Sequence, residues 1–331
     1  MKLAIGFITY NESTSPYLSY FLDSLAKALY FAKLSDSLIF AFDNSDSTST
    51  INKEIINQFQ LKRSDLKIQQ LKADKNIGFA RAYNIMIKEA LALEAEYFLV
   101  INPDIILNEN SLQLLVKEIS QRTDLVAVAP RIMRWDFNNL VKTNVIDSLG
   151  IGQRSALNFY DLAQGDLLLA NDEDIYRKKA EDIIAPSGAA GLYRLSALEA
   201  VAEERKAELN YFDERFFMYK EDCDLAHRLS IKGFKSKTVF DAVVYHDRTT
   251  KSLGGGVKNF FLARQEMSRP ARAWSFRNQH YIFLKYFALQ KTSSKIRIVI
   301  RMLGLFIFSL IFEQFNLKEY VNIIRFMRDL T

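Results

Sequence analysis

Through the first 130 residues, short apolar runs alternate with longer segments whose apolar residues recur at helical spacing. Short apolar runs bounded by turn residues are typical of buried strands, whereas apolar positions three and four residues apart indicate amphipathic helices. The predicted strands are 2–9, 37–42, 66–71, 97–101 and 125–129, the last closed by Pro130, and the predicted helices are 16–34, 52–59 and 78–93. Strands that alternate with helices predict an α/β domain with a Rossmann-like, largely parallel sheet.

Polar clusters directly follow three of these strands. They are Thr9-Tyr10-Asn11, Asp43-Asn44 and Asn102-Pro103-Asp104, and a late strand predicted at 238–245 delivers His246. In parallel sheets, ligands bind beyond the carboxyl ends of the strands. We therefore expect these clusters to meet at one edge of the sheet.

Three carboxylates, Glu221, Asp222 and Asp224, follow the apolar run 216–219 at the predicted start of a short helix that Gly233 ends. The N–H groups of a first helical turn stabilise anions, and this can explain any single acid here. A paired Glu-Asp at the edge of a core is also a good position for a general base. Asp224 is expected to pair with Arg228 four residues on, and a structural role is expected for Cys223 and His227.

The segment 131–182 is less regular and is predicted to be a partly looped insert near the site. The glycines of 187–191 allow the backbone to approach another group closely. Residues 251–256 end in three glycines and predict a flexible joint, either a hinge for a lid or a plain linker.

From about residue 264, arginine and lysine interleave with aromatic residues, and two further helical segments follow at 296–312 and 317–327. These helices are expected either to pack against the first domain or to lie in a membrane interface. The sequence thus divides into a domain at 1–250, a glycine-rich hinge at 251–263 and an amphipathic, membrane-associating extension at 264–331.

Composition narrows the functional classes. The chain has 331 residues, of which 49% are hydrophobic and 25% charged, as is ordinary for globular proteins. A net charge of +5 does not argue for a nucleic-acid partner. The single cysteine excludes an intramolecular disulfide, and three histidines argue against a multi-histidine zinc site. The apolar run 3–8 is too short for an export signal, and no apolar run has the roughly 18 residues of a spanning helix.

A set of motifs occurs in a distinctive order along residues 1–250. It comprises Thr9-Tyr10-Asn11, Asp43-Asn44-Ser45, the segment 76–84, Asn102-Pro103-Asp104, Gly188-Ala189-Ala190-Gly191, the segment 217–225 and His246. No single motif is decisive, but together they resemble a family 2 inverting glycosyltransferase of the GT-A fold, with the rhamnosyltransferase-like branch as the closest match. The motifs do not cover the chain beyond residue 264.

The resemblance implies roles for individual residues. Nucleotide contacts are implied for Thr9, Asn11, Asp43, Asn44, Asn76, Gly78, Arg81, Asn84 and Asn102. Gly78 would open a helix whose N–H groups face the diphosphate. Asp43 could instead cap a helix that begins near Ser47, and Arg81 could lie on a solvated helix face.

The same resemblance implies a cation site and a base. Asn102-Pro103-Asp104 stands where the family has Asp-x-Asp, so Asp104 is expected to bind Mn²⁺ or Mg²⁺, with His246 as a second ligand. Asn102 departs from the pattern and removes one carboxylate, and alone the motif reads as a proline turn. Asp222 is expected to be the general base, with Glu221 orienting the acceptor or with the two roles reversed. Gly188 and Ala189 match the acceptor-binding segment.

The expected activity is transfer of a sugar, L-rhamnose from dTDP-rhamnose in the favoured reading, to a glycan or polyprenyl-linked acceptor in cell-surface polysaccharide synthesis. The expected location is the cytoplasmic face of the cell membrane, held peripherally by the C-terminal helices, with no nucleic-acid partner. A nucleotidyltransferase would need a glycine-rich basic loop where residues 9–12 stand. A non-catalytic membrane-docking subunit stays open because of Asn102. An oxidoreductase would need a G-x-G-x-x-G after the first strand, which is lacking.

Overall fold

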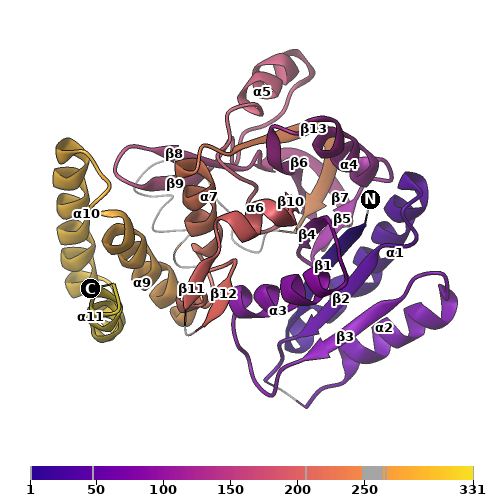
Figure 1. Cartoon of the computed structure of the whole chain (residues 1–331), viewed down its shortest axis with the longest axis horizontal. Helices are drawn as coiled ribbons and strands as arrows, with labels where there is room; N and C mark the ends of the chain where they lie inside the picture. Colours follow the sequence, from indigo (N-terminus) through magenta and orange to yellow (C-terminus); the bar gives the residue numbers. More distant parts are fainter. Residues whose placement is uncertain (1, 47, 206, 248–263, 265–266, 331) are drawn as a thin grey trace.

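The structure is a computed structural model that describes residues 2–46, 48–205, 207–247, 264 and 267–330 (Figure 1). The predicted hinge at 251–263 lies outside the described residues. Within them, nine strands form one sheet in the order β3-β2-β1-β4-β10-β6-β13-β5, with β7 paired to β6. These strands are β1 (Leu3–Thr9), β2 (Leu38–Asp43), β3 (Ile68–Lys72), β4 (Tyr97–Ile101), β5 (Ile105–Leu107), β6 (Leu125–Asp136), β7 (Val141–Ser148), β10 (Ala190–Arg194) and β13 (Lys235–His246).

Helices cover both faces of the sheet. The helices on one face are α1 (Ser15–Ala32), α2 (Ile51–Lys62) and α4 (Ser111–Gln121), and those on the other are α3 (Phe79–Ala92), α6 (Leu195–Ala200) and α7 (Glu221–Ile231). Alternation along β1 explains the two layers. Leu3, Ile5 and Phe7 belong to the core with α1, whereas Ala4 belongs to the core with α3. The predicted α/β class with a mostly parallel sheet is therefore confirmed.

The strand at 125–129 does not end at Pro130, as the sequence suggested, but continues as β6 to Asp136. A proline has no N–H to give to a neighbouring strand. Its partner β13 accommodates this, because the pairing register shifts between Val239, which lies opposite Pro130, and Val243. The irregularity in β13 thus lets the proline lie inside the sheet.

The segment expected to be partly looped contains more regular structure than its composition indicates. Besides β7 it forms the hairpin of β8 (Ile151–Arg154) with β9 (Asn158–Asp161), and the short helix α5 (Glu173–Lys179). A second small hairpin pairs β11 (Glu203–Arg205) with β12 (Glu208–Asn210). The mixture of aromatic and polar residues in 131–182 concealed the period-two pattern of these short strands.

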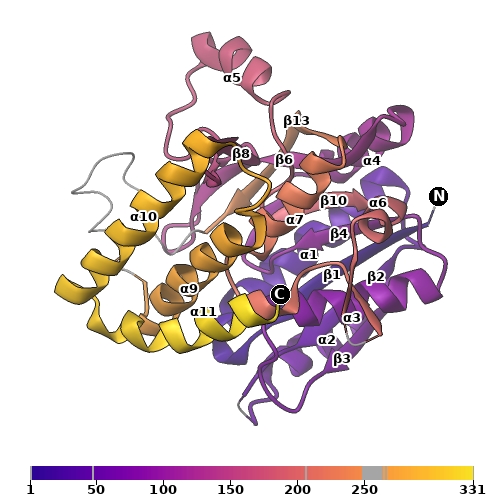
Figure 2. The ribbon, with the colours of Figure 1, turned by 60° about the vertical axis from the view of Figure 1, so that its left-hand side comes forward.

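Three C-terminal helices complete the described chain (Figure 2). They are α9 (Arg269–Tyr286), α10 (Thr292–Ile311) and α11 (Glu319–Arg328). Phe283 and Tyr286 of α9, Ile298 of α10 and Phe326 of α11 belong to the same buried cluster as α3 and α7. In its packing, α9 is therefore continuous with the domain that the sequence placed at 1–250.

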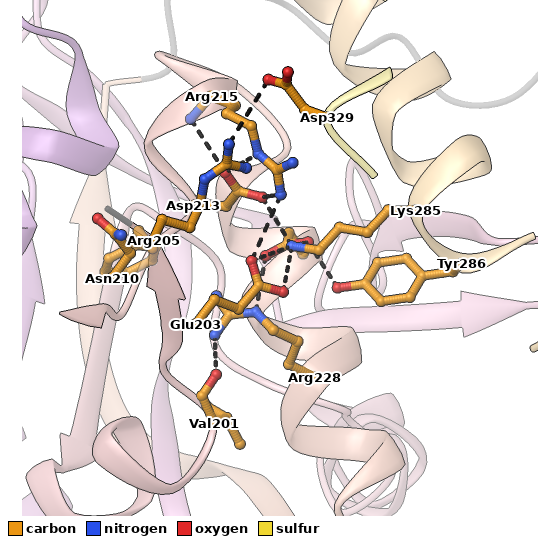
Figure 3. A network of polar contacts seen from close by, with 12 residues as sticks. Val201, Glu203, Arg205, Asn210, Asp213, Arg215, Arg228, Lys285, Tyr286 and Asp329 are labelled. Atoms are coloured by element: carbon orange, nitrogen blue, oxygen red, sulfur yellow. Dashed lines mark hydrogen bonds and ion pairs between the residues drawn. The ribbon is translucent and has the colours of Figure 1, made fainter. Parts of the chain in front are cut away.

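Buried ionic contacts join α9 to this domain (Figure 3). The Lys285 ammonium lies 2.7 Å from Asp224 and 2.8 Å from Asp213, and both carboxylates are fully buried. Tyr286 donates a hydrogen bond of 2.7 Å to Asp224. Arg228 binds the other Asp224 oxygen at 2.9 Å, which confirms the expected pair within α7. Two side chains of α9 thus enter a buried cluster beneath the acidic helix.

Candidate active site

The sheet topology brings the predicted polar clusters to one edge. β1, β2, β4 and β13 run in the same direction, while β10 runs against them. Thr9 and Asp43 end neighbouring strands and are directly paired. The start of β10, at Ala190, lies opposite Ile101 at the end of β4. Residues 188 and 189 therefore lie at the edge that also carries Asn102.

Asp104 and His246 lie side by side because β5 pairs with the end of β13, placing Ile105 opposite His246. The Asp104 Oδ2 atom is 3.3 Å from His246 Nε2. The other ring nitrogen, Nδ1, is 2.9 Å from Oδ2 of the buried Asp147. A carboxylate behind an imidazole fixes the orientation of the ring, as it does for metal-binding histidines.

The charges around His246 favour a positive group at this point. Burial lowers the pKa of His246, but the Asp104 and Asp147 carboxylates outweigh burial and raise this pKa to about 10. A cation that binds between Asp104 and His246 would take the place of this proton. The pair is therefore an electronegative position that accepts either a proton or a metal ion.

The donor atoms fit a divalent cation of the Mn²⁺ or Mg²⁺ kind. The Asp104 Oδ1 atom is buried and has no hydrogen-bond partner within the described protein, so a lone pair is available there. A carboxylate oxygen suits either ion, and the imidazole nitrogen of His246 favours Mn²⁺ of the two. Among the residues that the structure describes, no group of three or more His, Cys, Asp or Glu side chains could hold a metal. Water and the oxygens of a bound phosphate are suitable further ligands for such an ion.

Glu221 and Asp222 open α7 and differ in their surroundings. Asp222 is half-buried, and its Oδ2 accepts a hydrogen bond of 3.0 Å from the Gly188 N–H. The neighbouring Ala189 carbonyl accepts a hydrogen bond of 2.9 Å from the Asn102 N–H. The turn at Gly188-Ala189 thus links the Asp222 carboxylate to the strand end that leads to Asp104.

The Gly188 position leaves little space beside Asp222. A Cβ atom at residue 188 would lie 3.3 Å from Asp222 Oδ2, tighter than ordinary contacts. The glycine therefore allows the N–H to reach the carboxylate directly. This contact orients the Asp222 carboxylate.

Glu221 is buried, and its Oε2 atom has no hydrogen-bond partner in the described protein. Burial raises the pKa of Glu221 well above its ordinary value, and the Asp222 charge adds to the shift. Burial also raises the pKa of Tyr83, and the charges of Asp104 and Glu221 both add to that shift. The two adjacent carboxyl groups therefore lie in unequal environments, with Glu221 buried and Asp222 half-buried.

The residues expected around the nucleotide connect the three loops that follow β1, β2 and β3. The Asn44 side chain donates 3.0 Å to Asn76 Oδ1 and accepts 2.8 Å from the Ile77 N–H. The Asn76 side chain also accepts 2.9 Å from the Gly78 N–H. The Asn11 N–H donates 2.7 Å to Ser45 Oγ. These amides hold the loops after β1, β2 and β3 against one another.

The sequence left open whether Asp43 caps a helix and whether Arg81 lies on a solvated helix face. Asp43 lies 3.7 Å from Lys72 and accepts 3.2 Å from the Ser45 N–H, whereas α2 begins only at Ile51. Asp43 is therefore part of the loop at the sheet edge and does not cap that helix. Arg81 is exposed and lies 3.8 Å from Glu214.

The first N–H of α3 is not open to a diphosphate, in contrast to the expectation for Gly78. The Phe79 N–H donates 2.6 Å to the Phe217 carbonyl oxygen. Gly78 has φ = 84°, and a Cβ there would lie 2.4 Å from that oxygen. The glycine is required by this close approach of the 217 segment.

Asn84 has a structural position, and its expected nucleotide contact does not fit the described geometry. The residue is fully buried, its Nδ2 donates 2.8 Å to the Phe212 carbonyl, and its Oδ1 accepts from the N–H groups of Tyr211 and Phe212. Its amide is thus occupied by the backbone before α7. The sequence alone does not show whether the side chain of such an asparagine points to the nucleotide or into the core.

Some residues of the site were not foreseen from sequence. Asp147 comes from the irregular segment and had no motif to mark it. Tyr17 donates a hydrogen bond of 2.7 Å to Asp247, whose N–H donates one of 3.2 Å to the Asp104 carbonyl.

A hollow of about 490 Å³ beside α1 and β5 is lined by Tyr20, Trp135 and their neighbours, but by none of the predicted site residues. This hollow is therefore separate from the candidate site, which we identify from the side chains at the sheet edge.

Replacing Glu221 with glutamine is expected to stabilise the protein, by about 1–2 kcal/mol at pH 7, because it removes a buried titrating group whose Oε2 atom has no hydrogen-bond partner in the described protein. The pKa of Glu221 is raised in the folded state, so its penalty on folding appears as the pH rises above about 4, the unfolded value. Denaturant unfolding at pH 4 and pH 7 tests this, with the exposed Glu204→Gln as control. A loss of stability in Glu221→Gln at pH 7 would contradict the described environment.

Comparison with known proteins identifies the family and the fold of the chain. The model of Glycosyl transferase family 2 matches residues 5–201, more than half of the 331 residues. No curated protein sequence matches the chain. The structure is similar to that of the mannosyltransferase PcManGT from Pyrobaculum calidifontis in complex with GDP-Man and Mn²⁺, with a TM-score of 0.55 and 15% identity over 98% of this chain and 74% of that one.

The structure is also similar to that of GalNAc-T7 with UDP, GalNAc and Mn²⁺, with a TM-score of 0.54 and 13% sequence identity. The similarity covers 86% of this chain and 50% of that one. At such identities the two similarities concern the fold. The family match rests on the sequence itself and covers β2, β4 and β10 of the site edge, whereas Glu221, Asp222 and His246 lie beyond it. The chain belongs to glycosyl transferase family 2.

Proposed function

We propose that this glycosyltransferase moves a sugar from a nucleoside diphosphate sugar to an acceptor hydroxyl, with inversion and with the help of a divalent cation. The observation that carries the proposal is the arrangement at the sheet edge. The Asp104–His246 pair, with its 3.3 Å separation, and the Glu221–Asp222 pair are joined through Gly188-Ala189. One pair suits a cation at a diphosphate, and the other suits proton removal from an acceptor.

Asp104 and His246 would hold the cation, which neutralises the leaving diphosphate when it is bound. Both similar structures are complexes with Mn²⁺, and this supports a divalent ion here. Asn102 replaces the first acid of the family pattern, and His246, oriented by Asp147, compensates by supplying a second protein ligand. Mn²⁺ is the preferred ion and Mg²⁺ the alternative.

Asp222 would take the proton of the acceptor hydroxyl as its oxygen forms a bond to the anomeric carbon. The bond between that carbon and the diphosphate oxygen breaks on the opposite face, and the sugar inverts. The Gly188 N–H holds the Asp222 carboxylate in one orientation during this step. Glu221, whose pKa is raised by burial, would orient the acceptor, and reversal of the two roles is the alternative.

For the donor we propose dTDP-L-rhamnose, on the resemblance of the ordered motifs to the rhamnosyltransferase-like branch. The two similar structures contain GDP-mannose and UDP, so the preferred nucleotide of this protein must be measured. For the acceptor we propose a glycan or polyprenyl-linked glycan in cell-surface polysaccharide synthesis. The main rival is a non-catalytic docking subunit, which Asn102 leaves open.

Proton NMR of the transfer reaction tests the proposal. A panel of dTDP-, UDP- and GDP-sugars is incubated with Mn²⁺ and a lipid-linked acceptor. The expected result is release of a nucleoside diphosphate and a product whose anomeric configuration is opposite to that of the donor. Preference for a UDP-sugar would keep the enzyme class but discard rhamnose, and retention would discard the single-base mechanism. Absence of transfer and of nucleotide binding would favour the docking subunit.

We also propose that α10 lies on the cytoplasmic surface of the cell membrane. One side of α10 is turned to solvent and carries exposed apolar residues, namely Ile296, Val299, Ile300, Leu303, Ile307, Leu310 and Ile311. The other side packs on the protein through Ile298 and through Arg301, which donates 2.8 Å to the Ala156 carbonyl. The charged residues of α10 are all basic. None of the described helices is long and apolar enough to cross a membrane, and an amphipathic helix of this kind suits an interface.

The double substitution Leu303→Glu with Ile307→Glu is expected to weaken binding to vesicles containing phosphatidylglycerol at least tenfold. The side chains are 59% and 49% exposed, so the fold is retained while two apolar contacts with lipid are lost. Vesicle co-sedimentation measures the change. The control is Tyr30→Glu with Leu61→Glu, which adds the same charge at exposed positions on α1 and α2. Equal binding by both double variants would remove the membrane assignment.

A further inference from the structure

We propose that Asn278, on the C-terminal helix α9, is a positioning residue for the active site. Its amide holds the segment 216–219, which leads directly into Glu221 and Asp222 at the start of α7. The catalytic part of this inference rests on the proposed function, but the structural part does not. The family model ends at residue 201, so neither α9 nor this contact falls within the matched region.

The segment before α7 has an unusual backbone. Phe217, Tyr219 and Lys220 have φ values of 60°, 70° and 72°. These angles lie in the left-handed region, which side chains other than glycine disfavour. Such conformations persist only where the surrounding structure imposes them, and they cluster at functional sites. Something must therefore hold this segment in place.

Asn278 supplies a large part of that restraint. Its Nδ2 atom lies within hydrogen-bond distance of three carbonyl oxygens of the segment, at 2.6 Å from Phe216, 2.8 Å from Met218 and 2.7 Å from Tyr219, and its two N–H groups are shared among them. The residue is fully buried. One turn earlier on α9, the Trp274 ring packs against the Phe217 ring with centroids 4.9 Å apart. The three carbonyls are thus gathered around a single side chain.

A second helix contacts the same segment from another direction. The Phe217 carbonyl accepts the hydrogen bond from Phe79 at the start of α3, next to Gly78. The segment is therefore held between α3, which leads from the nucleotide loops, and α9. Since α9 is itself fixed to the domain by Lys285 and Tyr286, Asn278 cannot move away freely (Figure 3).

This restraint determines where the two acids lie. Only Lys220 separates the held segment from Glu221, so a shift of the segment moves the first turn of α7. A misplacement of about 1 Å at a catalytic group can reduce a rate about 100-fold. Asn278 therefore positions Asp222 against the acceptor, although it does not touch a reacting atom.

The test compares Asn278→Leu, which has a similar size but no donor, with Ile282→Ala, which removes a fully buried side chain one turn further along α9. Hydrogen exchange is measured on the amides of Phe79, Phe217 and Met218, all of which are hydrogen-bonded in the segment or to it. We expect at least tenfold faster exchange of these amides in Asn278→Leu, and unchanged exchange in Ile282→Ala. Asn278→Ser is the second variant, for use if the leucine variant does not fold.

Kinetics then tests the catalytic consequence. For Asn278→Leu we expect kcat to fall about 100-fold while the Kd of the donor nucleotide changes less than threefold. For Ile282→Ala we expect kcat within threefold of the unsubstituted protein. Unchanged exchange in both Asn278 variants would overturn the inference whether or not the protein is an enzyme. Faster exchange with kcat reduced less than tenfold would overturn the positioning role, and an inactive unsubstituted protein would overturn the proposed function alone.

Discussion

Replacing Asp222 with asparagine is expected to reduce the kcat of sugar transfer about 10³-fold while the donor nucleotide still binds. The substitution keeps the size of the side chain and removes the group that would take the acceptor proton, and general bases contribute about 10²–10⁴ to such rates. The Gly188 N–H can still donate to the carbonyl oxygen of the substituted side chain, so the local backbone is retained. Steady-state kinetics with calorimetry of the donor separates the two effects.

The matched control is Asp182→Asn, the same chemical change at an exposed position. It is expected to leave kcat unchanged. If Asp222→Asn retains more than a tenth of the turnover, the base is not Asp222, and Glu221→Gln becomes the variant to compare. A parallel loss of donor affinity would instead place Asp222 in nucleotide binding.

The largest expected effect on stability comes from Lys285→Met, which should lower the free energy of unfolding by about 3–5 kcal/mol. Lys285 lies beside Asp213, at 2.8 Å (Figure 3), and 2.7 Å from Asp224. Both carboxylates are fully buried. Without the ammonium, Asp213 keeps Arg215 and Asp224 keeps Arg228, but the cluster loses its shared cation. Denaturant unfolding monitored by circular dichroism measures the loss.

The same cluster predicts a direction for the pH dependence. Burial alone would raise the pKa of Asp213 and of Asp224, but the neighbouring cations outweigh it, so that both pKa values lie below the ordinary range. A lowered carboxylate pKa contributes stability that is complete above about pH 4 and is lost as the pH falls through the folded value. The difference between Lys285→Met and the unsubstituted protein should therefore be largest near neutrality and shrink below about pH 4.

Lys88→Met provides the contrast for this prediction. Lys88 pairs with Glu208 at 2.7 Å, but the two side chains are 38% and 68% exposed, and exposed pairs contribute at most about 1 kcal/mol. Equal losses in the two variants would contradict the view that α9 is fixed by a buried ionic cluster. They would also weaken the argument that α9 can restrain the segment before α7.

The elements that sequence predicted well are those with a strong period and clear ends. β1, β2, β4 and α3 begin and end within two residues of the expected bounds, because each combines an apolar face with turn residues on either side. The strand at 125–129 was expected to stop at a proline, a local rule that the irregularity in β13 overrides. Whether a strand continues past a proline depends on the strand it pairs with, and that partner cannot be read from the segment itself.

The sequence placed Asp104, Asp222 and His246 at strand or helix ends, and the structure has them there, while their roles in the site stay predictions. The site was not predictable where the decisive partner is remote. Asp147 lies 99 residues before His246, and Asn278 lies 60 residues after Met218. Asn84 belongs to a motif, but its side chain is fully buried and hydrogen-bonded to backbone groups.

The most direct test of the account is calorimetric titration of dTDP, UDP and GDP, with and without Mn²⁺, into the unsubstituted protein and into Asp104→Ala. The account predicts that one nucleoside diphosphate binds with Mn²⁺ and that omission of Mn²⁺ weakens its binding at least tenfold. Asp104→Ala should show the weak binding under both conditions. Metal-independent binding that Asp104→Ala leaves intact, or no binding of any of the three nucleotides, would contradict the proposed cation site and the transfer reaction built on it.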